Sequence, residues 1–240
     1  MNHQFELPAS YKKWTYGLIG AGIIALLYGI FAYHPFAAVS HAAGHDAHAS
    51  VNGTRFWAVL LQNSVFFLLV VNAAMFFICV TTMAMAGWVV AFRRVSEAIS
   101  SVVPILGLIT FAILLAIVFG GRTDIYHWLD KDAVAADHIL NGKKGFLNPT
   151  FFLIWSGLAI LGWWLLGKKM RSMSLQSDAD GHMDYETGSK WIWKNTVYAS
   201  LYCVVFTLTV ASTIPWLWLM SIDAHWYSTM YSWYTFASTF

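Results

Sequence analysis

Long apolar runs alternate with shorter polar segments along the sequence. A helix that crosses a hydrocarbon core about 30 Å thick needs about 20 apolar residues, and five of the runs are about that long or longer. A sixth run begins near the end of the sequence and is cut short by it. The predicted spans are residues 14–33, 55–92, 102–120, 150–167, 196–220 and 221–240, the last one incomplete. The pattern therefore predicts an all-α, polytopic membrane helix bundle.

The second run is longer than one crossing requires. As a single helix, residues 55–92 would measure more than about 50 Å at 1.5 Å per residue. We expect either a tilted, protruding helix or a first part around Asn63 that lies at the membrane interface. Arg93 and Arg94 then end the run. Near the end of the fifth span, Pro215 should kink the helix because it removes one backbone hydrogen bond.

The composition supports a membrane setting. The sequence is 58% hydrophobic and 11% charged, whereas about 25% of the residues of a soluble domain are charged. The net charge of +2 gives no reason to expect a nucleic-acid partner. Cys79 and Cys203 lie inside apolar runs, where a thiol behaves as a small hydrophobe, so we expect neither a disulfide nor a cysteine-based metal site.

The distribution of Lys and Arg predicts the orientation. Cytoplasmic loops carry an excess of these residues, and placing the N-terminus inside gives nine on the cytoplasmic side and five outside. Residues 34–54, residues 122–148 and the turn at Asp223 are then on the outer face, and residues 172–195 form a solvated inner connection. We expect residues 14–33 to be a retained helix, since the run is too long for an ordinary signal peptide. Because the sequence ends inside the sixth span, we also expect a longer or truncated protein.

Two rows of small or polar residues flank the turn at Asp223. If residues 221–240 are helical, one row runs down the last span at steps of three and four. Such rows either dock one membrane helix on another or line water for proton movement, and we favour docking. The last span carries Ser221, His225, Ser228, Ser232, Thr235 and Thr239, and the fifth carries Thr196, Ser200, Cys203, Thr207 and Ala211.

Asp223 and His225 are the most informative polar pair. In one interpretation Asp223 caps the sixth helix by accepting from its first free N–H groups. In the other, the pair ends a proton path on the outer side, since His titrates near pH 6.5 and a carboxylate stabilises its charged form. The candidate path continues through Ser228, Ser232, Thr235, Thr207 and Asn72, the deepest strongly polar side chain.

The remaining candidates are weaker. In the outer loop, Arg122, Asp124 and His127 are candidate site residues without an assigned role. Three further histidines, at steps of four and three, are compatible with a metal site, but their small, polar neighbours favour a flexible solvated loop. These are His41, His45 and His48.

Cofactor and catalytic motifs are missing from the sequence. A transmembrane haem needs axial histidines inside facing helices, and every His here lies at a predicted helix end or in a loop. There is also no Walker, CxxC, nucleotide-binding or nucleophile–base motif. We therefore predict no catalytic residue, no metal and no bound cofactor in this chain.

Four segments carry a resemblance to a known family. Residues 55–69, residues 86–94 with their paired arginines, residues 126–154 and residues 218–237 resemble the F subunit of bacterial alternative complex III. That complex is a quinol:cytochrome c oxidoreductase of the cytoplasmic membrane. One departure is Ala224, where the family often has Pro between the Asp and the His.

The resemblance implies a more detailed fold. The F subunit is similar to the C subunit and to membrane anchors of the polysulfide-reductase type, which contain two four-helix bundles. On that plan, residues 1–55 hold the leader, the first helix and the His-rich loop. Residues 56–220 form the first four-helix bundle, from spans two to five, and residues 221–240 begin the second.

The resemblance also implies partners and a role. The implied partners are the C and D membrane subunits, a multihaem and a monohaem cytochrome c subunit, an iron–sulfur subunit, lipids and, as a further candidate, a terminal oxidase. Quinol, haem c and iron–sulfur clusters would belong to the complex and not to this subunit. The implied role is proton conduction and scaffolding. A purely structural subunit is the alternative, and a secondary transporter, which should show broken helices in two matching repeats, ranks last.

Overall fold

The structure is a computed structural model that describes residues 8–33, 35, 45–181 and 183–240, with side chains described from residue 53 onward in the second of its helices. The described residues form helices and turns, without a strand. They belong to two compact units, residues 1–59 and 60–240, which are described separately. Five helical stretches among the described residues are long and apolar enough to cross a membrane. The chain is therefore a multi-pass membrane protein, as its pattern of apolar runs predicts.

The first unit contains α1 (Ala9–Tyr33) and the beginning of α2 (His45–Met83). α1 meets the length and apolarity of a membrane span. At Gly29 the two helices approach closely, because a Cβ added there would lie only 2.9 Å from Cε2 of Phe56. The indole N–H of Trp57 donates a hydrogen bond of 2.9 Å to the carbonyl of Pro35. These contacts join the end of α1 to α2.

The start of α2 corrects the prediction of a solvated loop through residue 54. The helix begins at His45, ten residues before the predicted span. A helix can be longer than the membrane is thick, because its polar part keeps its backbone hydrogen bonds and can extend into water. The apolar run therefore marks the membrane segment of α2 and not its beginning.

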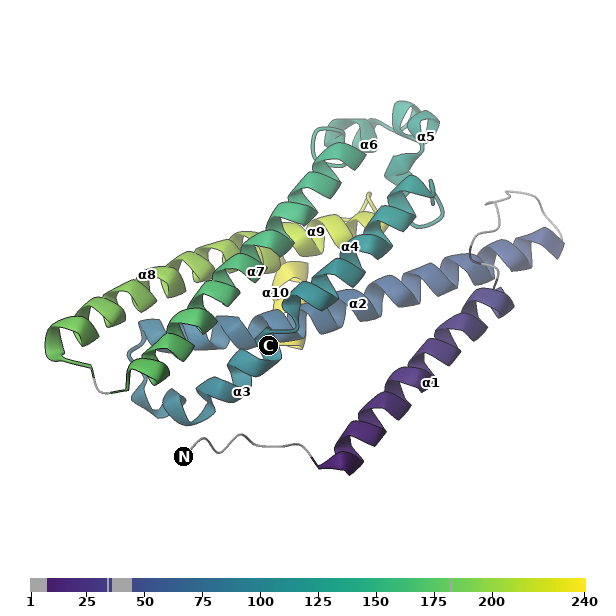
Figure 1. Ribbon diagram of the computed structural model, residues 1–240. Coiled ribbons are helices and arrows are strands. Elements are labelled where there is room, and N and C mark those ends of the chain that lie inside the picture. Colours follow the sequence, from purple (N-terminus) through teal and green to yellow (C-terminus); the bar gives the residue numbers. More distant parts are fainter. Residues whose placement is uncertain (1–7, 34, 36–44, 182) are drawn as a thin grey trace. The chain divides into compact units, whose positions relative to one another are not determined.

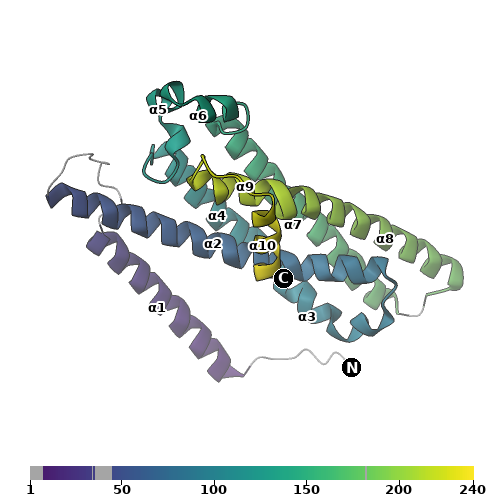
Figure 2. The same ribbon diagram turned by 180° about the vertical axis from the view of Figure 1, so that it is seen from behind.

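The second unit contains the rest of α2 and all later elements (Figures 1 and 2). They are η1 (Gly87–Val89), α3 (Val90–Ser100), α4 (Val103–Phe119), η2 (His127–Leu129), α5 (Lys131–Ala136), α6 (His138–Lys143), α7 (Pro149–Asp180), α8 (Tyr185–Leu208), η3 (Thr209–Thr213), α9 (Ile214–Trp218), η4 (Met220–Ile222) and α10 (Met230–Thr239). The end with η2, α5, α6 and residues 223–229 is called the loop end. The opposite end, with α3 and the start of α8, is called the α3 end.

The long helices α2, α4, α7 and α8 form the predicted four-helix bundle. α7 packs between α4 and α8, and α4 comes so near that a Cβ at Gly107 would lie 2.6 Å from Cγ2 of Ile160. α2 joins α8 through stacked rings of Phe76 and Phe206, whose centroids are 4.2 Å apart. Buried apolar contacts of this kind, together with small residues at close crossings, stabilise the packing of helices.

The second predicted span does not continue to residue 92. α2 ends at Met83, where the N–H of Met85 donates to the carbonyl of Thr82 and that of Ala86 to Thr81. This pair of bonds is a Schellman motif, with Met85 in the left-handed conformation at φ 52°. Gly usually occupies that position, so a Met there does not signal the end of the helix.

The predicted end of the third span is confirmed. α4 stops at Phe119, followed by Gly120 and by Gly121 at φ 58°. The N–H of Gly121 donates to Val118 and that of Arg122 to Ile117, which is the same motif with Gly in the left-handed position. The predicted end agrees with the structure because Gly121 is a residue that readily adopts the left-handed conformation.

The predicted solvated connection over residues 172–195 is mostly helical. α7 begins at Pro149, where the side chain of Asn148 accepts from the N–H of Phe151 at 2.8 Å, and runs to Asp180. α8 begins at Tyr185. The polar residues therefore mark the expected water boundary, while both helices extend past it.

The sixth predicted span is wrong over its first half. Residues 223–229 are not helical, and α10 covers only Met230–Thr239, too short to count as a span. Before Pro215, the predicted kink takes the form of the π-helical turn η3, Thr209–Thr213. Wider turns of this type are a recognised cause of helix bending.

Candidate functional site

The loop end brings His225 and Asp137 together. His225 lies in the turn before α10, and Asp137 precedes α6. The imidazole Nε2 of His225 and Oδ2 of Asp137 form an ion pair when the His is protonated. The side chain of His225 is 55% exposed and that of Asp137 28%, so water and protons can reach the pair. Sequence reasoning selected His225 but not its partner.

Asp137 has two roles. Its Oδ1 accepts from the N–H groups of Ile139 at 2.8 Å and Leu140 at 3.4 Å, so it caps α6. The hydrogen bond with His225, followed by that cap, lowers the pKa of Asp137 below its ordinary value. Asp137 is therefore the carboxylate that can stabilise a protonated His225, the part that the sequence analysis gave to Asp223.

Asp223 does not cap the last helix. Its Oδ1 accepts from the backbone N–H of His225 at 3.3 Å, whereas α10 begins seven residues later, at Met230. The local bond is an Asx turn, which Asp forms readily. Beside it, Nζ of Lys143 donates to the carbonyl of Ala224 at 2.5 Å. The turn is therefore held to α6 by Lys143 and His225.

The predicted row on the last span is helical only in its second part. Ser221 belongs to η4, and His225 and Ser228 lie in the non-helical segment. Ser232, Thr235 and Thr239 are buried on one face of α10.

The hydroxyls of that face all donate to backbone carbonyls. Ser232 donates to the carbonyl of Ser212 in η3 at 3.3 Å, and Thr235 and Thr239 each donate at 2.9 Å to the carbonyl four residues earlier. The first bond docks α10 on η3, whereas the other two stay within α10.

The row on α8 behaves in the same way. Thr196 and Ser200 each donate at 2.9 Å to the carbonyl four residues earlier. Cys203 is partly buried and Thr207 is exposed. Further along, the indole of Trp163 donates to the hydroxyl of Thr209 at 2.9 Å. The hydroxyls of Thr196 and Ser200 thus bond their own backbone, and that of Thr209 accepts from a Trp side chain of α7.

Asn72 is fully buried at mid-bundle. The hydroxyl of Tyr202 in α8 donates to its side-chain oxygen, and also lies 3.3 Å from its backbone carbonyl. Within the described part of the chain, Nδ2 of Asn72 has no hydrogen-bond partner. An unpaired buried amide is costly, so Nδ2 of Asn72 is a hydrogen-bond donor inside the bundle that a further polar group could satisfy. Tyr202, the partner, carries no sequence signal that distinguishes it from other Tyr residues.

The outer-loop candidates separate into two groups. Arg122 and Asp124 are close, with Nε and Oδ1 at 3.4 Å and side chains 8% and 12% exposed. His127 is exposed. Between them, the fully buried Tyr126 donates at 2.8 Å to the carbonyl of Trp218. Burial raises the pKa of Tyr126 well above its ordinary value, so its hydroxyl remains a donor that anchors the loop to α9.

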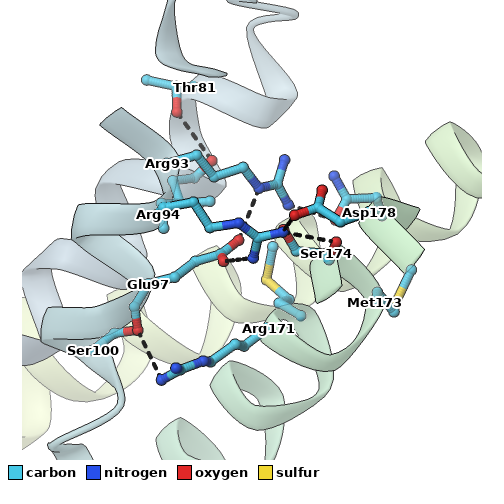
Figure 3. A network of polar contacts seen from close by, with 12 residues as sticks. Thr81, Arg93, Arg94, Glu97, Ser100, Arg171, Met173, Ser174 and Asp178 are labelled. Atoms are coloured by element: carbon cyan, nitrogen blue, oxygen red, sulfur yellow. Dashed lines mark hydrogen bonds and ion pairs between the residues drawn. The ribbon is translucent and has the colours of Figure 1, made fainter. Parts of the chain in front are cut away.

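The α3 end holds a polar network that sequence reasoning missed (Figure 3). The carboxylate of Glu97, only 3% exposed, accepts from Nε of Arg93 at 2.9 Å and from Nη1 of Arg94 at 2.6 Å. Arg94 also donates to the carbonyl of Ser174 at 3.2 Å and pairs with Asp178 on α7. A buried carboxylate is tolerated only when it is paired in this way.

Further bonds extend the network to α7 and α8. Nη1 of Arg171 donates to the backbone carbonyl of Glu97 at 3.5 Å, and Nη2 of Arg93 donates to Oδ1 of Asn195 at 3.4 Å. The guanidinium of Arg93 also lies over the ring of Trp191, 5.8 Å from its centroid. The network therefore ties α3 to two long helices. The spacing of Glu97, three and four residues after two arginines, is the signal that could have revealed it.

A metal site is not apparent among the described residues, where no group of three His, Cys, Asp or Glu side chains could hold an ion. His41 lies outside the described residues, and so do the side chains of His45 and His48. The prediction about these three histidines therefore stays a prediction. Cys79 and Cys203 are free thiols.

Comparison with protein-family models and with curated proteins found no match for this chain. Fold and composition alone therefore place it among multi-span helical membrane proteins.

Proposed function

We propose that the chain is an integral subunit of a respiratory quinol:cytochrome c oxidoreductase of the alternative complex III type, in the cytoplasmic membrane of a bacterium. It holds no redox cofactor and serves as a scaffold beside the quinol-oxidising C subunit. Haem c and iron–sulfur clusters belong to the cytochrome and iron–sulfur subunits around it. The sequence resemblance over four segments supports this assignment, and so does the four-helix bundle that the resemblance implies.

α1 is the element that carries the scaffold role, because it is long and apolar enough to be a membrane span and belongs to a compact unit distinct from residues 60–240. In a membrane protein the outer face of a span meets lipid or another membrane subunit. The buried Ser232 of α10 bonds the carbonyl of Ser212 in η3, a packing contact that also fits a structural subunit.

Co-purification tests the assignment. The chain, carrying an affinity tag, is isolated from its native membranes in mild detergent. We expect it to bring c-type haem, recorded as a reduced-minus-oxidised absorbance band, and quinol:cytochrome c activity. After its partners are dissociated, the isolated chain should show no Soret band. A preparation that carries neither haem nor activity would remove the respiratory assignment, and a stoichiometric haem in the isolated chain would remove the scaffold role.

Proton conduction is a second candidate role, favoured by the His225–Asp137 pair. This pair is accessible to water at the loop end, and Asn72 with Tyr202 provides polar atoms deep in the bundle. His can take up and release protons near neutral pH, so the pair suits the exposed terminus of a path.

Variants of the pair separate the two roles. If the His225–Asp137 pair conducts protons, Asp137→Asn and His225→Ala lower the protons moved per electron in vesicles of the assembled complex, while quinol oxidation continues. Matched controls are Asp132→Asn and His127→Ala, which change exposed side chains of the same end. Normal coupling in both variants of the pair would leave only the scaffold role.

A further inference from the structure

A groove of about 570 Å³ lies between the second half of α7 and the first half of α8. Its lining combines three lysines with three aromatic residues, next to apolar side chains such as Met173 and Val197. The cations and rings are Lys169, Lys190, Lys194, Trp191, Trp193 and Tyr198. Neither the bundle packing nor the proposed respiratory role uses these side chains together.

The groove lies where the two helices cross the expected boundary between hydrocarbon and water. Lys169 lies two residues after Gly167, where the apolar part of α7 ends, and Lys194 lies two residues before Thr196, where the apolar part of α8 begins. Trp and Tyr are enriched at this level of a membrane, where their rings meet the headgroup region. All three lysines are exposed, so their ammonium groups are available to a ligand that arrives from the lipid phase.

The walls of the groove are held in place. The indole N–H of Trp191 donates to the carbonyl of Met173 at 3.3 Å, and the guanidinium of Arg93 covers its ring at 5.8 Å. Nζ of Lys169 lies 5.8 Å from the ring centroid of Tyr198. Contacts between the helices therefore fix two of the aromatic side chains before any ligand binds, which reduces the entropy lost on binding.

The charge in the groove is positive. Asp180 is the one acidic residue of the lining, against three lysines. Lys190 also pairs with Glu186 at 2.5 Å, with both side chains at least 70% exposed, and an exposed pair of this kind is weak and easily exchanged. Asp178, nearby on α7, is occupied by Arg94. An anion is therefore the ligand that the groove complements.

We propose that this groove binds the headgroup of an anionic phospholipid, such as phosphatidylglycerol or cardiolipin. The lysines bind the phosphate oxygens, and the acyl chains lie along the apolar surface of α7 and α8. Basic pockets between membrane helices are known to bind such headgroups. A free phosphate ion offers the same oxygens but gains nothing from the apolar surface below, so the lipid is the ligand that uses the whole groove.

Native mass spectrometry of the full chain tests the proposal. The protein is purified in detergent and titrated with phosphatidylglycerol or phosphatidylcholine. We expect retained phosphatidylglycerol on the unmodified chain, with phosphatidylcholine retained at least about tenfold less. Replacing Lys169, Lys190 and Lys194 together by Gln should weaken phosphatidylglycerol retention about 100-fold, on the basis of about fivefold for each lysine near the lipid surface.

Two controls keep the result interpretable. Lys12, Lys131 and Lys144 are exposed lysines outside the groove, so their joint replacement by Gln removes the same charge and should leave retention unchanged. Replacing the groove lysines by Arg should preserve binding, which separates charge from misfolding. Equal retention of the two lipids, or equal loss in the control triple, would overturn the proposal. Displacement of the lipid by millimolar inorganic phosphate would reassign the groove to a free anion.

Discussion

The two ends of the bundle differ in how ion pairs connect distant segments. At the α3 end, Glu97 is buried beside two arginines, and the network around it connects α3 to α7 and α8. At the loop end, the pair that joins distant segments, His225–Asp137, is exposed, the buried Arg122–Asp124 pair is local, and the buried anchor between distant segments is the neutral Tyr126. A buried ion pair fixes a structure because losing one partner leaves a desolvated charge, whereas an exposed pair is screened by water and contributes little to stability. The first end is therefore suited to holding helices together, and the second leaves its ion pair in contact with water.

The largest effect is expected from removing Glu97. Glu97→Ala leaves Arg93 and Arg94 without their shared carboxylate, which should destabilise the protein by about 2–4 kcal/mol, less than for a fully buried network because Arg94 is partly exposed. Glu186→Ala is the matched control, since its pair with Lys190 is exposed, and it should cost about 0–0.5 kcal/mol. Thermal unfolding in detergent, followed by circular dichroism, measures both. Equal losses would mean that the network does not hold the α3 end.

A smaller effect is expected from the neutral anchor at the loop end. Tyr126→Phe removes the donor to the carbonyl of Trp218 and leaves that carbonyl buried, at a cost of about 1–2 kcal/mol. Tyr185→Phe changes a side chain that is 90% exposed and should be neutral. Limited proteolysis within residues 122–148 should accelerate in the first variant only. If both variants are cut at the rate of the unmodified chain, Tyr126 is not the anchor.

The smallest effect is the pH dependence of the exposed pair. The pKa of Asp137 is lowered in the folded state, so its contribution to stability is complete above the pKa of an unfolded Asp, about 3.9. It disappears as the pH falls through the lower folded value. The difference in melting temperature between the unmodified chain and Asp137→Asn should therefore be larger at pH 6 than at pH 3. Asp132→Asn should show no such dependence, and a difference that grows toward pH 3 would contradict the assignment.

Most of the fold could be predicted from the sequence, because apolar runs report the membrane segments directly. The starts of α4 and α7 carry Pro104 and Asn148, and the end of α4 carries Gly120 and Gly121, residues whose conformational preferences mark helix ends. The stop of α2 at Met85 carries no such residue. The polar extensions of α7 and α8 were missed because hydropathy reports where the membrane ends and not where a helix ends.

The site was less predictable, because it depends on which segments meet. His225 could be selected from its turn, but Asp137 is 88 residues away, and spacing along the sequence says nothing about that contact. Glu97 could have been found, since its spacing from Arg93 and Arg94 is local. Sequence reasoning therefore identifies single polar residues and helix-internal pairs more readily than pairs formed by tertiary packing.

We propose that the two ends face opposite sides of the membrane, with the α3 end in the cytoplasm, because this orientation places the excess of Lys and Arg inside. Ala135 on α5 and Ala179 on α7 are exposed positions at the two ends. Each is replaced by Cys in a chain that lacks Cys79 and Cys203, and intact cells are treated with a membrane-impermeant maleimide. We predict labelling of the Cys introduced at position 135 in intact cells, and labelling of the one at position 179 only after lysis. The reverse pattern would contradict the orientation and the placement of the His225–Asp137 pair on the outer face.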